Sequence, residues 1–157
     1  MLEIHLLTKI YFKIFIIDME CNVYKEVNGV DEKKIKEVVF GTLKKLNRGR
    51  GEVSVHVVSK KKIKSLNKKY RKKNRVTDVL SFGTEDLQNK TEQDLGDIFI
   101  CLEQIKKQAK ENKIVWQEEL GRMIVHGVMH LLGYDHQNSK DSKAMFRKQE
   151  KFVNELL

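Results

Sequence analysis

The sequence contains no proline and only two cysteines, Cys21 and Cys101, among its 157 residues. Two cysteines do not make the disulfide framework of a small secreted domain, and we expect small buried thiols in a reducing, cytosolic setting. Long apolar runs are also missing: Lys13 and Asp18 bracket a run of only four residues near the N-terminus. A membrane span needs about 18 apolar residues, and a signal peptide needs roughly 7–15. The sequence therefore favours a cytoplasmic protein without a membrane partner.

The chain has the composition of a globular protein, because 40% of its residues are hydrophobic and 34% are charged. It has no linker, internal repeat or low-complexity block. We therefore expect a single domain over residues 1–157, with residues 1–12 interpreted as an N-terminal extension before the first strand.

The positive charge is concentrated in one segment. The net charge is +9, and residues 60–75, KKKIKSLNKKYRKKNR, contain ten basic residues and no acidic one. The other 21 basic residues face 22 acidic residues, which leaves −1 for the rest of the chain. One interpretation is a solvated helix face; the other is a surface that binds an anionic partner, most plausibly nucleic acid. The side chains expected to contact phosphates are Lys60, Lys61, Lys64, Lys68, Lys72, Lys73 and Arg75.

Hydrophobic periodicity predicts short strands early in the chain and helices late. The predicted strands cover residues 10–17, 52–59, 77–83 and 95–102, and the predicted helices cover 31–46, 60–75, 103–112, 116–132 and 139–156. Tyr70 and Phe146 are expected in the buried stripes of their helices, and His56 is expected to be structural or exposed. The order favours an α+β fold, in which a small, mostly four-stranded sheet packs with about five helices.

Three of the five histidines lie in the segment HGVMHLLGYDH, residues 126–136. His126 and His130 are four residues apart, so a helix places them one turn apart on the same face. Gly133 is suited to end that helix in a left-handed conformation, after which His136 can turn back toward the first two. Three nitrogen ligands with an open fourth position are typical of a catalytic zinc site. The alternative is three unrelated histidines near a helix end, but the spacing matches the ligands of the H-E-x-x-H-x-x-G-x-x-H metal site.

Gly127 stands where zinc proteases of this type carry their general base, a glutamate. Glycine cannot move a proton, and Glu118 and Glu119 are two turns upstream, where first-turn carboxylates are common. The sequence therefore predicts the metal site without the peptidase base, which argues against proteolysis.

Together with NKKYRKKNRVTDVLSF and LGDIFI, the histidine segment resembles the YbeY family of bacterial metal-dependent endoribonucleases. The resemblance covers residues 50–156, about two-thirds of the chain. It implies one Zn²⁺ per chain, bound by His126, His130 and His136 in a zincin-like site at the end of a helix. It also implies that Arg71, which follows Tyr70, is the essential arginine. The family's usual proline after TDVLSF is Gly83 here, which leaves the geometry of that turn open.

The resemblance implies a single-strand-specific, zinc-dependent endoribonuclease that matures the 3′ end of 16S ribosomal RNA and acts in ribosome quality control. Its catalytic residues would be Arg71 and His126, and its partners would be ribosomal RNA precursors and the small ribosomal subunit. Two alternatives stay open: a metal-dependent hydrolase of another class, such as a peptidase, and an RNA-binding ribosome-assembly factor with structural zinc. Asp78 is either a turn residue or a carboxylate that orients an imidazole.

Overall fold

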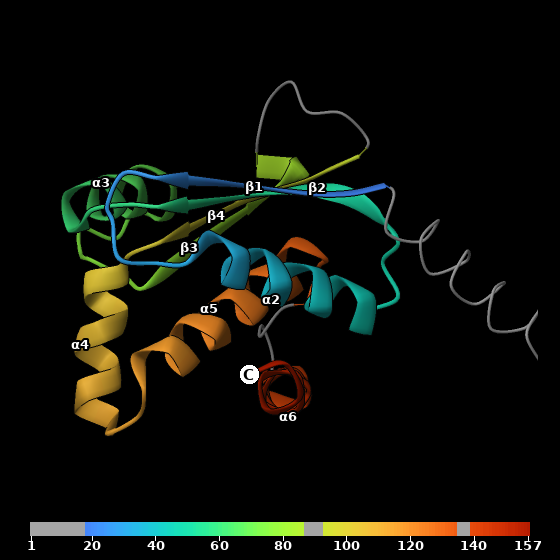
Figure 1. Ribbon diagram of the computed structural model, residues 1–157. Helices are drawn as coiled ribbons and strands as arrows, with labels where there is room; N and C mark the ends of the chain where they lie inside the picture. The colour runs from blue at the N-terminus through green and yellow to red at the C-terminus, as the bar shows by residue number, and fades with distance from the viewer. Residues whose placement is uncertain (1–17, 87–92, 135–138) are drawn as a thin grey trace, which may run out of the picture.

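The computed structural model describes residues 18–86, 93–134 and 139–157, and for residues 139–141 it describes the backbone only (Figure 1). The predicted strand 10–17 and the predicted extension 1–12 lie outside the described residues. The elements in chain order are β1 (Asp18–Lys25), α2 (Glu32–Lys45), β2 (Arg50–Val57), α3 (Lys60–Arg71), β3 (Val79–Gly83), the 3₁₀ turn η1 (Thr84–Asp86), β4 (Asp94–Ile100), α4 (Leu102–Asn112), α5 (Trp116–Leu131) and α6 (Ser139–Leu156).

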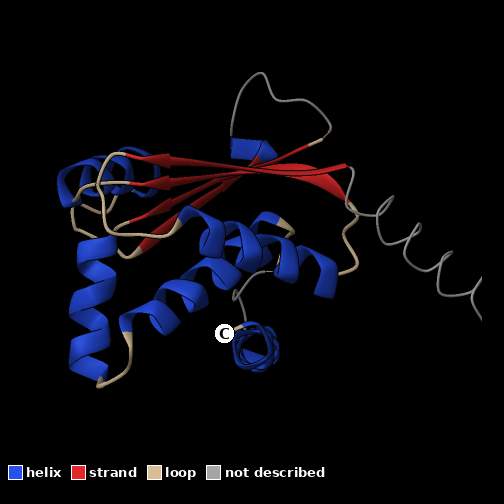
Figure 2. Cartoon of the chain, in the orientation of Figure 1, coloured by secondary structure: helices blue, strands red, loops and turns tan. Residues whose placement is uncertain are grey.

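The four described strands form one mixed sheet in the order β1-β2-β4-β3. Strands β1, β2 and β4 run parallel, and β3 pairs antiparallel with β4. Helices α2 and α5 lie against one face of the sheet, and α6 packs below α5 (Figures 1 and 2). This arrangement confirms the predicted α+β class with a small four-stranded sheet and about five helices.

The main core lies between the sheet and the helices α2 and α5. On the sheet side, Val53, Val55 and Val57 of β2 are fully buried, as their alternation in the sequence predicts. Ile35 of α2 and Ile124 of α5 are 1% exposed and belong to the same cluster. Each such side chain contributes about 1.5–3 kcal/mol on burial, so this layer fixes α5 relative to the sheet.

A second, smaller cluster holds α3 on the opposite face of the sheet. Ile63 of α3 is fully buried beside Leu80 and Phe82 of β3. Strand β3 alternates, so Val79 packs in the main core while Leu80 packs beneath α3. The short strand β3 therefore contacts α3 with one face and α5 with the other, and it lies between the two predicted groups of site residues.

Two predictions about buried aromatic residues are wrong. Tyr70 is 46% exposed and Phe146 is 60% exposed. Near the end of α3, Asn67 is buried instead, at 3% exposure, while Tyr70 meets Phe82 edge-on with a ring-centroid distance of 5.0 Å. In α6, Met145 occupies the buried position and the next residue along the helix, Phe146, points away from it.

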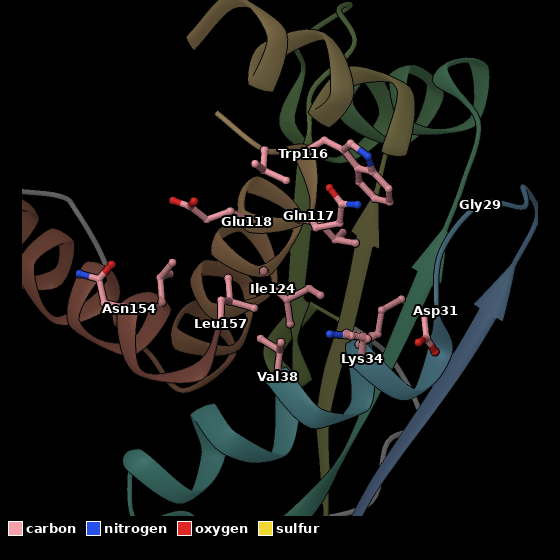
Figure 3. A pocket seen from close by; sticks show the side chains of 15 residues that line it. Gly29, Asp31, Lys34, Val38, Trp116, Gln117, Glu118, Ile124, Asn154 and Leu157 are labelled. Carbon is pink, nitrogen blue, oxygen red and sulfur yellow. The ribbon is translucent and has the colours of Figure 1, made fainter. Parts of the chain in front are cut away.

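A cavity of about 730 Å³ opens between α2, α5 and the end of α6 (Figure 3). Val38, Ile124 and Leu157 give its lining apolar side chains, and Lys34 and Glu118 also line it. None of the residues that line it belongs to the predicted site. Among the helices that the structure describes, none has the length and apolar character needed to cross a membrane.

Candidate active site

The two described histidines of the HGVMHLLGYDH segment converge at the end of α5. The Nε2 atoms of His126 and His130 lie 3.0 Å apart, and the ring centroids are 4.5 Å apart. Two imidazoles bound to one tetrahedral zinc at about 2.0–2.1 Å have nitrogens roughly 3.3 Å apart. The pair therefore has nearly the spacing that a shared metal ion requires.

The third predicted ligand, His136, lies outside the described residues, as does Asp135. Within the described ranges, no three His, Cys, Asp or Glu side chains come close enough to hold a metal. The chain does leave α5 as predicted, since Gly133 has a positive φ of 84° and Tyr134 N donates to Met129 O at 3.0 Å. The three-histidine site therefore stays a prediction, while the structure brings together its first two members.

His126 has a further partner that the sequence did not predict. Gln149 of α6 is 5% exposed, and its Oε1 lies 2.8 Å from His126 Nδ1. A glutamine 23 residues downstream carries no signal in the sequence, because the rotation of α6 against α5 decides which side chain faces the imidazole.

Arg71 is the last residue of α3, where the helix ends for a local reason. Lys72 adopts a left-handed conformation with a φ of 59°, and Asn67 Nδ2 donates to Arg75 O at 2.9 Å. The helix is therefore four residues shorter than the predicted 60–75. Arg71 Nη2 donates to Ser81 O at 2.9 Å, and its Cζ lies 5.5 Å from the centre of the Phe82 ring. These two contacts hold the guanidinium of Arg71 against β3.

A single cleft of about 690 Å³ joins the two groups of predicted residues. Arg71, Lys73, His126 and His130 all line it. Its other lining residues, which the sequence did not single out, include Ser81, Glu85, Asp86 and Tyr134. The cleft thus places a fixed cation and a pair of imidazoles around one space that is open to solvent.

Gly127 faces the sheet and is buried. A Cβ atom there would lie 2.9 Å from Ile98 Cγ2 and 3.2 Å from Ser81 Oγ. Packing therefore also disfavours a glutamate at this position, because α5 approaches β3 and β4 too closely to leave room for a side chain. The same close approach brings the histidines next to β3, whose Ser81 carbonyl holds Arg71.

All ten basic residues of the 60–75 segment are exposed. Lys73 lines the cleft, whereas Lys60 pairs with Glu103 at 3.2 Å and Lys72 Nζ donates to Lys69 O at 3.2 Å. The exposed positions are consistent with phosphate binding, which stays a prediction for Lys60, Lys61, Lys64, Lys68, Lys72, Lys73 and Arg75.

The remaining polar candidates have structural contacts. His56 stacks between Tyr24 and Phe99, with centroid distances of 5.0 and 4.4 Å, and lies 2.8 Å from Asp97 Oδ1. Asp78 Oδ1 accepts a hydrogen bond from Val79 N at 2.9 Å, which is the role of a turn residue. Both cysteines are buried free thiols, as predicted. Burial raises the pKa of the Cys21 thiol to about 11.

Comparison with known proteins agrees with this description of the fold. The family model described as Endoribonuclease YbeY matches residues 20–157. The Endoribonuclease YbeY of Sulfurihydrogenibium sp. (strain YO3AOP1) is 38% identical over 137 residues, which cover 85% of this chain and 90% of the relative. That of Oceanobacillus iheyensis is 36% identical over 151 residues, which cover 88% of this chain and 97% of the relative.

A solved structure has the same fold. The solution structure of TM1509 from Thermotoga maritima is 33% identical in sequence, with a TM-score of 0.62, and the match covers 87% of this chain and 88% of that one. The family model and the relatives span nearly all of the described fold, including both walls of the cleft. The chain therefore belongs to the YbeY family of endoribonucleases.

Proposed function

We propose that this chain is a zinc-dependent endoribonuclease that cuts single-stranded RNA in the cleft between α3, β3 and α5. The observation that carries the proposal is the common cleft, which Arg71 lines from one side and His126 and His130 line from the other. RNA hydrolysis needs a binding site for a phosphodiester beside a fixed positive charge, and the open space of the cleft beside the guanidinium of Arg71 supports such a site.

His126 and His130, with His136 as the third ligand, would hold the zinc ion. The spacing of 3.0 Å between the two described Nε2 atoms supports the fit. A zinc ion bound there would supply a Lewis acid for a phosphoryl oxygen and a source of hydroxide at neutral pH.

Arg71 would bind the scissile phosphate. Its guanidinium uses one N–H to reach Ser81 O, and the planar group can donate other N–H bonds to two phosphate oxygens in a forked geometry. When water attacks the phosphorus and a ribose oxygen leaves, negative charge develops on the phosphate oxygens, and a guanidinium held in place by Ser81 and Phe82 would stabilise that charge without reorganising. Lys73 and the exposed lysines of α3 would contact neighbouring phosphates without reading the sequence.

The substrate we propose is ribosomal RNA precursor on the small ribosomal subunit in the cytoplasm, with maturation of the 16S 3′ end and quality control as the roles. The exposed basic segment and the family membership support this choice. A peptidase is disfavoured, because Gly127 stands where its glutamate base would be. Gly127 packs so closely on Ile98 that a side chain at this position has no room.

The test offers an unstructured RNA and a generic peptide side by side to the purified protein, with and without a chelator. We expect the protein to cleave the RNA but not the peptide, and we expect the chelator to abolish the RNA cleavage. Cleavage of the peptide would favour a hydrolase of another class, and RNA binding without cleavage would favour an assembly factor with structural zinc.

A further inference from the structure

Helix α6 delivers one buried polar group to the candidate site. Gln149 is 5% exposed, and its Oε1 lies 2.8 Å from His126 Nδ1. The next residue, Glu150, anchors this part of α6 to α5, because its carboxylate accepts from Arg122 Nε at 2.9 Å. This contact with Arg122 links the two helices one turn before His126, and Arg122 also donates to Glu119 of its own helix at 2.6 Å. The position of Gln149 is thereby set by contacts outside the cleft.

The chemistry of this contact defines the proton on His126. An amide oxygen only accepts hydrogen bonds, so the Nδ1 atom that faces Gln149 Oε1 must donate. A neutral imidazole has one N–H, and a proton on Nδ1 leaves the lone pair on Nε2. Nε2 is the atom that faces His130 Nε2 at 3.0 Å. The contact therefore turns the metal-binding lone pair of His126 toward its partner histidine.

We propose that Gln149 is a positioning residue that holds His126 in the Nδ1–H tautomer and so preorganises its Nε2 as a zinc ligand. The inference rests on the proposed function, because it assumes that His126 binds zinc. Hydrogen bonds that orient ligand histidines commonly change metal affinity by about 10–100-fold when they are removed.

Two substitutions separate the hydrogen bond from the volume of the side chain. Gln149→Leu keeps a similar size but has no acceptor, so it leaves the half-buried Nδ1 without its partner. Gln149→Glu keeps an acceptor at the same reach and should rescue the tautomer. Gln108→Leu is the matched control, because Gln108 Oε1 is buried and, among the described residues, has no hydrogen-bond partner.

The first measurement is the tautomer of His126 in the zinc-free, full-length protein, read from two-bond ¹H–¹⁵N correlations of the imidazole ring. We expect the Nδ1–H form in the wild type, in Gln149→Glu and in Gln108→Leu, and a shift toward the Nε2–H form in Gln149→Leu. The second is the zinc dissociation constant, measured by competition with a chromophoric chelator. It should rise about 10–100-fold in Gln149→Leu and stay unchanged in Gln108→Leu.

An Nε2–H tautomer in the wild type would overturn the inference, as would a Gln149→Leu protein with unchanged tautomer and zinc affinity. If that happened while the wild type still bound zinc and cut RNA, the proposed function would stand and only the role of Gln149 would fall. If the wild type bound no zinc at all, the metal assignment of the proposed function would fail, and the role of Gln149 as a zinc-positioning residue would fail with it.

Discussion

Gly127→Glu restores the sequence H-E-x-x-H of a zinc protease, and the structure predicts that it destabilises the fold without creating a peptidase. The Cβ alone would lie 2.9 Å from Ile98 Cγ2 and 3.0 Å from Ile98 Cδ1. Ile98 is fully buried in the middle of β4, so it has little room to move. Overpacking of this kind costs about 1–3 kcal/mol, and replacing a helical glycine returns about 1 kcal/mol.

The carboxylate adds the larger cost. It would be buried between α5 and the sheet, and an unpaired buried carboxyl group costs several kcal/mol whether it ionises or is forced to stay neutral. The net loss is about 3–6 kcal/mol, a large part of the roughly 5–15 kcal/mol that stabilises a typical domain. With an m-value of about 2 kcal/mol/M, the urea midpoint falls by roughly 1.5–3 M.

Urea unfolding followed by circular dichroism, with chelator present, measures this loss without a contribution from bound metal. Gly127→Ala tests the Cβ contacts alone and should lose about 0–2 kcal/mol. Gly83→Ala is the control, because a Cβ at Gly83 meets nothing within 4 Å, and it should stay within about 0.5 kcal/mol of the wild type. A Gly127→Glu protein as stable as Gly127→Ala would contradict the expected burial cost, since the carboxylate would then have found space or solvent.

Three further predictions follow from the cleft and the core. Arg71→Ala should keep the fold and the bound zinc but lower the RNA cleavage rate about 10²–10³-fold, and unchanged turnover would remove Arg71 from the mechanism. If about five basic side chains bind phosphates, affinity for single-stranded RNA should fall on the order of 100-fold between about 50 and 200 mM salt; a flat response would show that the lysines only solvate the surface. Burial raises the pKa of Cys21 from 9.0 to about 11, so stability should be full below about pH 9 and decline as the pH rises toward 11. Cys21→Ala should show less of that decline, and an identical pH dependence would contradict the assignment.

Local patterns in the sequence predicted the elements whose partners are near in the chain. The alternation of Val53, Val55 and Val57 identified β2, and the predicted helix 31–46 begins at Asp31, which caps α2 by accepting from Lys33 N at 2.9 Å. The positive φ of Gly133 ends α5 as the sequence predicted. These features depend on periodicity and capping, which a short window of residues contains.

Features that depend on packing between distant segments were not predicted. Strand β1 has a mixed burial pattern, so its place at residues 18–25 follows from pairing with β2 and not from a run of apolar residues. Gln149 and Ser81 acquire their roles only when α6 and β3 dock against α5 and α3. The family resemblance pointed to Arg71 and the histidines, but the contacts that orient them required the tertiary structure.

RNA cleavage during zinc add-back is the sharpest test of the proposed zinc-dependent endoribonuclease. The purified protein is stripped of metal with a chelator, and the cleavage rate of an unstructured RNA is then followed as zinc is titrated. We expect negligible cleavage without zinc and a rate that saturates at about one zinc per chain, and we expect neither tight zinc binding nor cleavage from His130→Ala. Full cleavage by the metal-free protein, or by His130→Ala, would contradict it.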